Sequence, residues 1–304
     1  MTTIRAAIAR WPIPAYILLA FAFSWVFTFL VSVSILFGLI ALFGPAVAAI
    51  VVTRADGTFS ELRQRITAWR QPLIWYIAAV GIPFGVAATA RAVHVMSGGA
   101  PLGFGTISAI EIVIFVLVIG EEIGWRGFLQ PRLRLRFSIV AAGAITGVIW
   151  TLWHLPIYLQ PSTGLLDFAV FAWWVIPLAI VMGFVAEGTR FSVIVATVMH
   201  GSANIATPIL LPEVDPTWTR VVTGAIYLAV ATAFVVFDAC GIGRPPTPRS
   251  GQRPPDLSSG RRREHPNEPP LASPAGAFCC LKSVGQPDEF PKIDPAGLCA
   301  PSLR

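Results

Sequence analysis

Two adjacent carboxylates stand where an otherwise apolar stretch of this sequence should cross a lipid bilayer. Glu121 and Glu122 follow directly on the apolar residues 112–119 and open the segment 120–133, GEEIGWRGFLQPRL. A charged side chain near the centre of a bilayer-spanning helix costs on the order of 3 kcal/mol. Because such residues usually face the interior of a helix bundle and serve a pathway or a reaction, this segment is the first candidate for chemistry.

Helical spacing predicts different surroundings for the two glutamates. Glu122 and Arg126 are four residues apart and share a helix face, where an ion pair would lower the cost of burying either side chain. Glu121 lies about 100° away around the helix, so its carboxylate can face a separate cavity and take up a proton. A purely structural ion-pair network would place the same residues together, and the spacing alone leaves both interpretations open.

Two further segments carry polar side chains inside apolar runs. His154 lies in 150–156, WTLWHLP, and His200 lies four residues before Asn204 on one helix face. Each alone has an ordinary explanation, as a hydrogen-bonded core histidine or as polar groups that join helices. Hydrocarbon offers polar groups no other partners, however, so residues from three predicted helices have to meet one another. The sequence therefore predicts a single buried polar site formed by Glu121, Glu122, Arg126, His154, His200 and Asn204.

Composition predicts the elements that position these residues. The 304 residues are 55% hydrophobic and 12% charged, against about 25% charged in an ordinary soluble domain. Apolar runs of about 20 residues can each span a bilayer as a helix. We therefore predict an all-α, polytopic transmembrane helix bundle of about eight spans, at residues 14–31, 35–53, 73–96, 106–130, 138–158, 166–186, 191–211 and 218–237.

The basic residues are placed as in a protein embedded in a lipid bilayer. The net charge of +6 gathers in alternate loops and towards the C-terminus, which indicates membrane orientation and not a nucleic-acid partner. The pattern predicts that both termini are cytoplasmic, at the plasma (cytoplasmic) membrane if the source is bacterial, with Arg220 at an outer helix end as the main exception. Residues 59–69 form either an interfacial helix or a solvated basic loop. We divide the chain into a helical domain, 1–240, and a Pro/Arg-rich cytoplasmic tail, 241–304, that is predicted to be disordered.

Three motifs in the polar segments are shared with a known family. They are Glu121-Glu122-x-x-x-Arg126, an aromatic residue four positions before His154, and His200-x-x-x-Asn204. In order and spacing they resemble the CAAX-protease and bacteriocin-processing (CPBP, or Abi) family of intramembrane endopeptidases, the family of CAAX prenyl protease 2. The resemblance in helix layout covers about residues 16–237 and leaves out the C-terminal tail.

The sequence departs from this family at two places. Trp150 begins the second motif, where the family usually has phenylalanine, and Gly201 and Ser202 replace bulkier residues in the third. We expect these changes to alter packing and to widen the cavity.

The resemblance implies a role for each residue and a peptide or membrane-protein substrate. Glu121 would act as the general base on a water molecule held jointly with His154, since carboxylate and imidazole both exchange protons. His200 and Asn204 would donate hydrogen bonds to the oxyanion of the scissile carbonyl, where a preorganised donor contributes about 3 to 4 kcal/mol. Glu122 and Arg126 would hold the geometry of their helix.

The resemblance leaves a metal open, because the family has been described both as intramembrane metalloproteases and as metal-free glutamate proteases. Glu121, His154 and His200 are a plausible Zn²⁺ ligand set. The sequence lacks the helix-borne H-E-x-x-H signature of many zinc peptidases. We therefore expect a water molecule activated by glutamate, with zinc as an option.

Alternative functions use the same buried polar residues. A membrane transporter, or an immunity or scaffold protein, could bind an ion, peptide or partner there without catalysis. Transporters often contain matching pairs of Gly/Pro-interrupted spans, which this sequence does not show. A serine mechanism through Ser202 would leave Glu121 and Glu122 unexplained.

Overall fold

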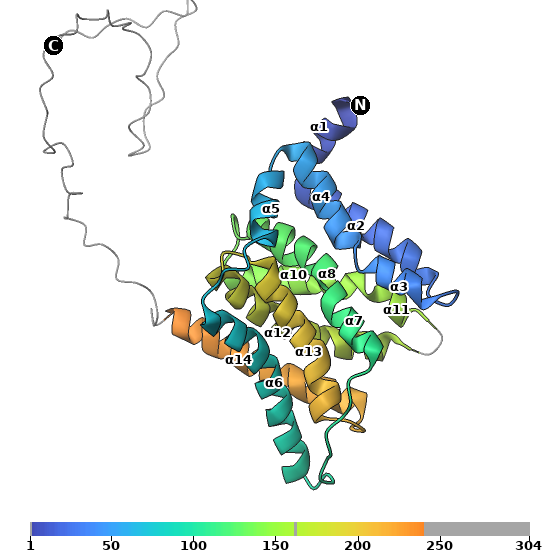
Figure 1. The fold of residues 1–304 in the computed structure, drawn as a ribbon, viewed down its shortest axis with the longest axis vertical. Helices are drawn as coiled ribbons and strands as arrows, with labels where there is room; N and C mark the ends of the chain where they lie inside the picture. The colour runs from blue at the N-terminus through green and yellow to red at the C-terminus, as the bar shows by residue number, and fades with distance from the viewer. Residues whose placement is uncertain (1, 161–162, 240–304) are drawn as a thin grey trace, which may run out of the picture. The chain divides into compact units, whose positions relative to one another are not determined.

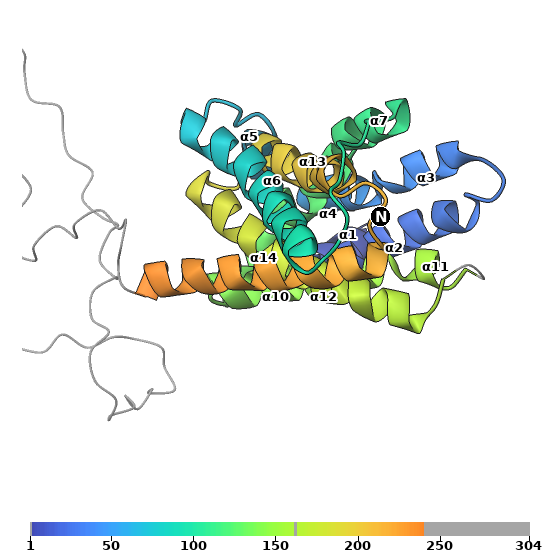
Figure 2. The same cartoon turned by 90° about the horizontal axis from the view of Figure 1, so that it is seen from below.

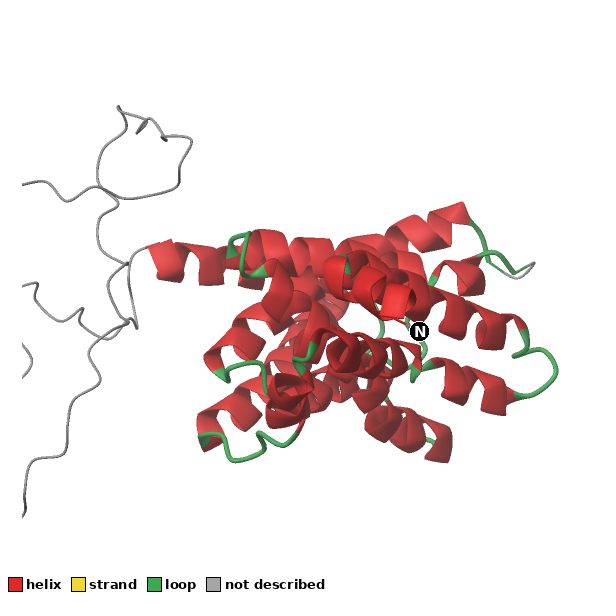
Figure 3. Cartoon of the chain, turned by 90° about the horizontal axis from the view of Figure 1, so that it is seen from above, coloured by secondary structure: helices red, strands yellow, loops and turns green. Residues whose placement is uncertain are grey.

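Helices account for all the regular secondary structure in the part of the chain that the computed structural model describes, residues 2–160 and 163–239 (Figures 1 and 3). The predicted all-α class is therefore confirmed for these residues. The predicted domain boundary near residue 240 and the tail 241–304 lie outside them.

Within residues 2–160 and 163–239, six helices are long and apolar enough to cross a membrane. The predicted spans 138–158 and 106–130 are not among these six, because the first forms a short helix and the second is interrupted. The prediction of about eight spans is thus met in part. The six candidate spans are Pro12–Phe29, Ile35–Asp56, Leu73–Met96, Leu165–Gly188, Val193–Leu210 and Pro216–Phe237.

The N-terminal part contains a break that the apolar pattern does not reveal. The predicted helix 35–53 is divided at residues 42–43, because a proline follows Gly44 and takes one of the first positions of a new helix, where its missing N–H is tolerated. The hydroxyl of Ser24 donates to the carbonyl oxygen of Ala41 at 2.7 Å and ties the break to the preceding helix. The helices of this part are α1 (Thr2–Arg10), α2 (Pro12–Phe29), α3 (Ile35–Ala41) and α4 (Gly44–Asp56).

The basic segment after α4 forms a helix that packs on the core. In α5 (Phe59–Ile66), Leu62 is fully buried, and the side chain of Arg65 donates to the carbonyl oxygen of Gly127 at 3.0 Å. Trp69, just beyond the helix, is exposed. The alternative of a solvated basic loop is therefore wrong for this segment.

The helix that carries the two glutamates is interrupted and widened. The span predicted at 106–130 is met in part, since the segment is helical in pieces that are interrupted at Val118 and pass through a π-helical turn. Pro131 has no N–H to bond the carbonyl of Gly127 four residues earlier, and Arg65 binds that carbonyl instead. Turns of this kind are frequent at functional sites. The pieces are α7 (Ala109–Leu117), α8 (Ile119–Gly124), the π-turn η1 (Trp125–Leu129) and α9 (Gln130–Leu133).

The remaining helices enclose this broken segment. Helix α13 packs against α6, α7 and α8, while α12 packs against α10 and α14, which lies along it in Figure 2. Glycines allow α10 and α12 to approach closely: a Cβ atom at Gly143 would lie 2.9 Å from the Cα atom of Ile180. These helices are α6 (Leu73–Met96), α10 (Ile139–Trp153), α11 (Leu155–Tyr158), α12 (Leu165–Gly188), α13 (Val193–Leu210) and α14 (Pro216–Ala239).

Candidate active site

Glu122 is the centre of a fully buried charge cluster. Its Oε1 atom accepts hydrogen bonds from Nη1 of Arg126 at 2.9 Å and from Nδ1 of His200 at 2.8 Å. Glu122 and Arg126 have no exposed surface, and His200 is 5% exposed. The pair predicted from the four-residue spacing thus forms, and the structure adds a partner from α13. Two hydrogen-bond donors on one carboxylate oxygen fix its position.

Glu121 is buried beside this cluster but has a different environment. Its Oε2 atom accepts a hydrogen bond from the indole Nε1 of Trp150 at 2.8 Å. Glu121 is 2% exposed and forms no ion pair with any described residue. The two neighbouring glutamates therefore differ in the way the sequence predicts: one is paired and the other is oriented by a neutral donor.

Trp150 contacts the other motif residues as well. The guanidinium carbon of Arg126 lies 4.7 Å from the centre of the indole ring, and the His200 ring meets it edge-on at 4.9 Å. The backbone carbonyl oxygen of Trp150 lies 2.9 Å from Nδ1 of His154. The sequence motif indicated only an aromatic residue here. The polar indole N–H, absent from the phenylalanine usual at this position, was the signal of a wider role.

His154 ends helix α10 and is partly exposed. Because a carbonyl oxygen can only accept, the contact with Trp150 places a proton on Nδ1 and leaves Nε2 available for other chemistry. The ring packs edge-on against Trp153 at 4.7 Å and Phe171 at 4.8 Å. Pro156 restricts the helix just after this point, so the histidine sits at the break between α10 and α11.

Asn204 lies one helical turn after His200 but in a different environment. It is partly buried, forms no side-chain hydrogen bond with the described residues, and lines a cavity of about 250 Å³ between α12, α13 and α14. The structure therefore joins Glu121, Glu122, Arg126, His154 and His200 through direct contacts or through Trp150. It leaves Asn204 at the edge of that cluster.

The three residues predicted as an optional zinc set are not grouped as ligands in this arrangement. Among the described residues, no three His, Cys, Asp or Glu side chains lie together as metal ligands. The Nδ1 atoms of His154 and His200 are engaged by a carbonyl and a carboxylate, which leaves each Nε2 atom available, as in histidines that bind a metal. The optional zinc ion therefore stays a prediction, and we route no chemical step through a metal.

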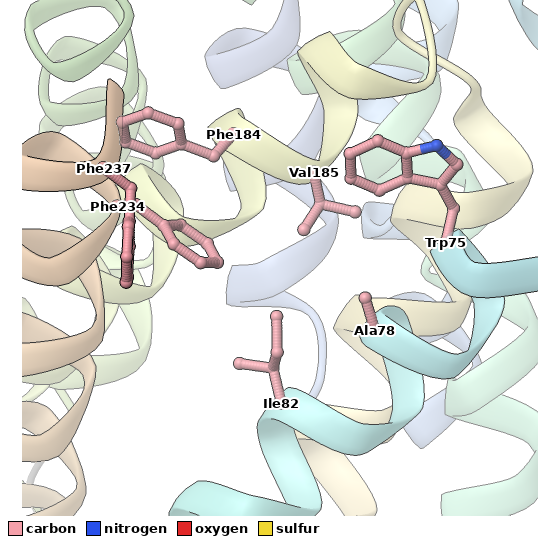
Figure 4. A pocket seen from close by; sticks show the side chains of 7 residues that line it. All are labelled: Trp75, Ala78, Ile82, Phe184, Val185, Phe234 and Phe237. Atoms are coloured by element: carbon pink, nitrogen blue, oxygen red, sulfur yellow. The ribbon is translucent and has the colours of Figure 1, made fainter. Parts of the chain in front are cut away.

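A second cavity, of about 270 Å³, contains none of the predicted site residues. Its lining is mostly apolar, with Phe184 of α12 and Phe234 of α14 facing Ile82 and Trp75 of α6 (Figure 4). None of the seven lining side chains is a carboxylate, an imidazole or another group that exchanges protons readily. The polar cluster around Glu121 and Glu122 is therefore the candidate active site.

Comparison with known proteins supports this assignment. Residues 102–206 match the family described as type II CAAX prenyl endopeptidase Rce1-like, and all six predicted site residues fall inside this segment. Through this segment the chain is similar to the Rce1-like family. The resemblance predicted from the three motifs is thus confirmed, and the apolar helices together with this match indicate an integral membrane protein.

A curated relative belongs to the same group. CAAX prenyl protease 2 of Methanococcus maripaludis is 27% identical over 147 residues, which cover 45% of this chain and 53% of the relative. The chain therefore matches about half the length of this curated relative.

Proposed function

We propose that this protein is an intramembrane endopeptidase that hydrolyses peptide bonds of membrane-associated proteins or peptides. The observation that carries the proposal is the difference in hydrogen-bond partners between the neighbouring residues Glu121 and Glu122. Glu122 is held in place by Arg126 and His200, while Glu121 is oriented by a neutral indole N–H and pairs with no cation among the described residues. The match of residues 102–206 to the Rce1-like family and the name of the archaeal relative support the same reaction class.

In the proposed reaction Glu121 is the general base. Its carboxylate accepts a proton from a water molecule, and the resulting hydroxide attacks the carbonyl carbon of the scissile peptide bond. The carbon–oxygen bond forms and the carbonyl oxygen becomes an oxyanion. When the carbon–nitrogen bond breaks, the protonated Glu121 returns its proton to the departing amine. Atoms and protons therefore balance without another reactant.

His154 assists this base in the proposal. Its Nδ1–H is directed to the Trp150 carbonyl, so Nε2 is the atom that accepts a hydrogen bond from the attacking water. The aromatic rings of Trp153 and Phe171 at its edges restrict rotation of the imidazole. A fixed acceptor beside the base lowers the entropy cost of positioning the water.

Donors for the oxyanion come from α13 in the proposal. Asn204 has a free amide N–H group at the cavity edge. His200 donates to Glu122 through Nδ1, so its Nε2 has to carry a second proton to act as a donor. Loss of one such donor typically costs about 3 to 4 kcal/mol of transition-state stabilisation.

We also propose the membrane arrangement predicted from the sequence. The broken segment α7–α9 and the short helix α10 would complete a domain of about eight spans, and both termini would be cytoplasmic, at the plasma membrane if the source is bacterial. A transporter, immunity or scaffold role for the polar site has no comparable observation in its favour.

Comparative peptidomics tests the proposed function. Membranes that contain the full chain are compared with membranes that contain Glu121→Gln, which keeps the shape of the side chain and removes the base. We expect a set of peptides to disappear in the variant while the amount of inserted protein stays the same. If the two membranes contain the same set of peptides, the proposed protease activity is refuted. Dialysis against a chelator, with the metal content measured, tests the metal-free route in the same assay.

A further inference from the structure

A polar cavity adjoins the candidate active site and has no role in the mechanism above. It measures about 250 Å³ and lies between α12, α13 and α14, the last two of which appear in Figure 1 beside α12. Its polar lining comes from Asn204, Thr207, Thr219, Arg220 and Thr223. Arg220 is partly exposed near the start of α14, and the neighbouring Thr219 hydroxyl is buried without a partner among the described residues, an arrangement that indicates a ligand.

The cavity shares one residue, Asn204, with the proposed catalytic site and adjoins two others. Asn204 lies on its wall, and one turn earlier on the same helix face is His200. The opposite wall includes Phe171, whose ring meets the His154 ring at 4.8 Å. A substrate whose scissile bond lies at His154 and Asn204 would therefore place neighbouring atoms in this cavity.

Arg220 gives the cavity its charge. It forms no ion pair with a carboxylate among the described residues, and the phenol of Tyr158 lies within electrostatic range of its guanidinium. The nearby carboxylate of Asp167 is engaged elsewhere, since it accepts the backbone N–H of Gly164 at 3.0 Å at the start of α12. Arg220 is also the residue that departs from the positive-inside pattern of the sequence.

A second donor in the same wall has no partner. The hydroxyl oxygen of Thr219 is buried without a hydrogen bond to any described residue, and the residue is only 4% exposed. The bond from Thr223 to Thr219, at 2.6 Å, is made to the backbone carbonyl of Thr219 and not to its hydroxyl. Buried polar groups are rarely left without a partner, and this one lines the cavity beside a guanidinium.

We propose that this cavity binds a carboxylate of the substrate, held by Arg220 and Thr219. The inference rests on the proposed function for its biological meaning. A guanidinium presents paired N–H donors that match a carboxylate, and the threonine hydroxyl supplies a third donor. An uncharged amide would leave the guanidinium uncompensated. The carboxylate belongs either to the C-terminus of a peptide or to an acidic side chain close to the scissile bond.

Binding to the full-length Glu121→Gln protein in nanodiscs tests the proposal without relying on cleavage. The probes are N-acetyl-Ala-Leu-Leu as free acid, the same peptide as C-terminal amide, and N-acetyl-Asp-Leu-Leu amide, each followed by calorimetry. We expect the free acid to bind about tenfold or more tightly than the first amide, which corresponds to about 1.4 kcal/mol. Tight binding of the aspartyl amide would assign the carboxylate to an acidic side chain.

Variants of the arginine identify the group responsible. Arg220→Gln should abolish the preference for the acid, Arg220→Lys should retain part of it, and the exposed Arg63→Gln should leave it intact while changing the net charge equally. Thermal unfolding checks that each variant is folded. Equal binding of acid and amide, absence of binding by all three probes, or a preference that survives Arg220→Gln would overturn the proposal. A protein that cleaves nothing but prefers the acid would refute only the proposed function.

Discussion

Replacing Trp150 with phenylalanine should remove its hydrogen bond to Glu121 and keep its contacts with Arg126, His200 and His154. The change removes the indole N–H that bonds Glu121 at 2.8 Å. It keeps an aromatic ring under the Arg126 guanidinium and beside His200. The contact to His154 also survives, because it is made by the backbone carbonyl of residue 150. The perturbation therefore falls on one carboxylate.

The expected size of the effect follows from that single hydrogen bond. A hydrogen bond to a charged group contributes about 1.5 to 3 kcal/mol. At 1.4 kcal/mol for each factor of ten, kcat should fall roughly 10-fold to 150-fold. KM should change little, since Trp150 contacts the catalytic residues and not the apolar surface that would receive most of the substrate. A purely structural role would instead lower the stability of the fold.

The assay is turnover of a peptide from the peptidomics experiment in proteoliposomes, together with thermal unfolding. Trp153→Phe is the matched control: it lies on the same helix, is 6% exposed, and its indole N–H has no hydrogen-bond partner among the described residues. The control should keep its kcat. If Trp150→Phe is fully active, helix α8 alone positions Glu121, as the phenylalanine usual in the family implies, and our account of the indole is wrong. Equal losses in both variants would also contradict it.

Two further predictions concern the stability of the bundle. Arg126→Met leaves the Glu122 carboxylate buried with only His200 as partner, so the free energy of unfolding should fall by about 3 to 5 kcal/mol in denaturant titrations; an unchanged midpoint would show that Glu122 is not charged. Gly143→Ala places a Cβ atom 2.9 Å from the Ile180 backbone and should cost about 1 to 3 kcal/mol. Gly81→Ala, which meets nothing within 4 Å, should instead raise stability by about 0.5 to 1 kcal/mol, and a loss there would show that the effect is not steric.

The apolar pattern predicted long helices well and interruptions poorly. Helix α6 has the predicted bounds of residues 73–96, because a continuous apolar run decides both its length and its membrane-spanning character. The breaks at 42–43 and 118 were not predicted, since apolarity does not change there. The first break coincides with the proline after Gly44, and the two broken segments also meet each other: a Cβ atom at Gly120 would lie 2.8 Å from the carbonyl oxygen of Leu42.

In the candidate site, too, contacts within one helix were predictable from the sequence, whereas contacts between helices were not. The pairing of Glu122 with Arg126 was predictable because it depends on spacing along one helix. The bond from His200 to Glu122 joins residues 78 positions apart, and the bond from Trp150 to Glu121 joins residues 29 apart. The motif order suggested that these segments meet but not which atoms bond. The placement of Asn204 on a separate cavity wall likewise depends on α14, which the motifs do not include.

The interrupted helix explains how adjacent glutamates come to serve different purposes. Consecutive residues on a helix point about 100° apart, so α8 directs Glu122 towards His200 of α13 and Glu121 towards Trp150 of α10. The π-turn that follows widens the helix, and its freed carbonyl at Gly127 is bound by Arg65. That bond fixes the turn that carries Arg126, and Arg126 in turn pairs with Glu122. A chain of contacts from helix α5 thus holds Glu122, and this arrangement is the basis on which we propose Glu121 as the residue that exchanges a proton.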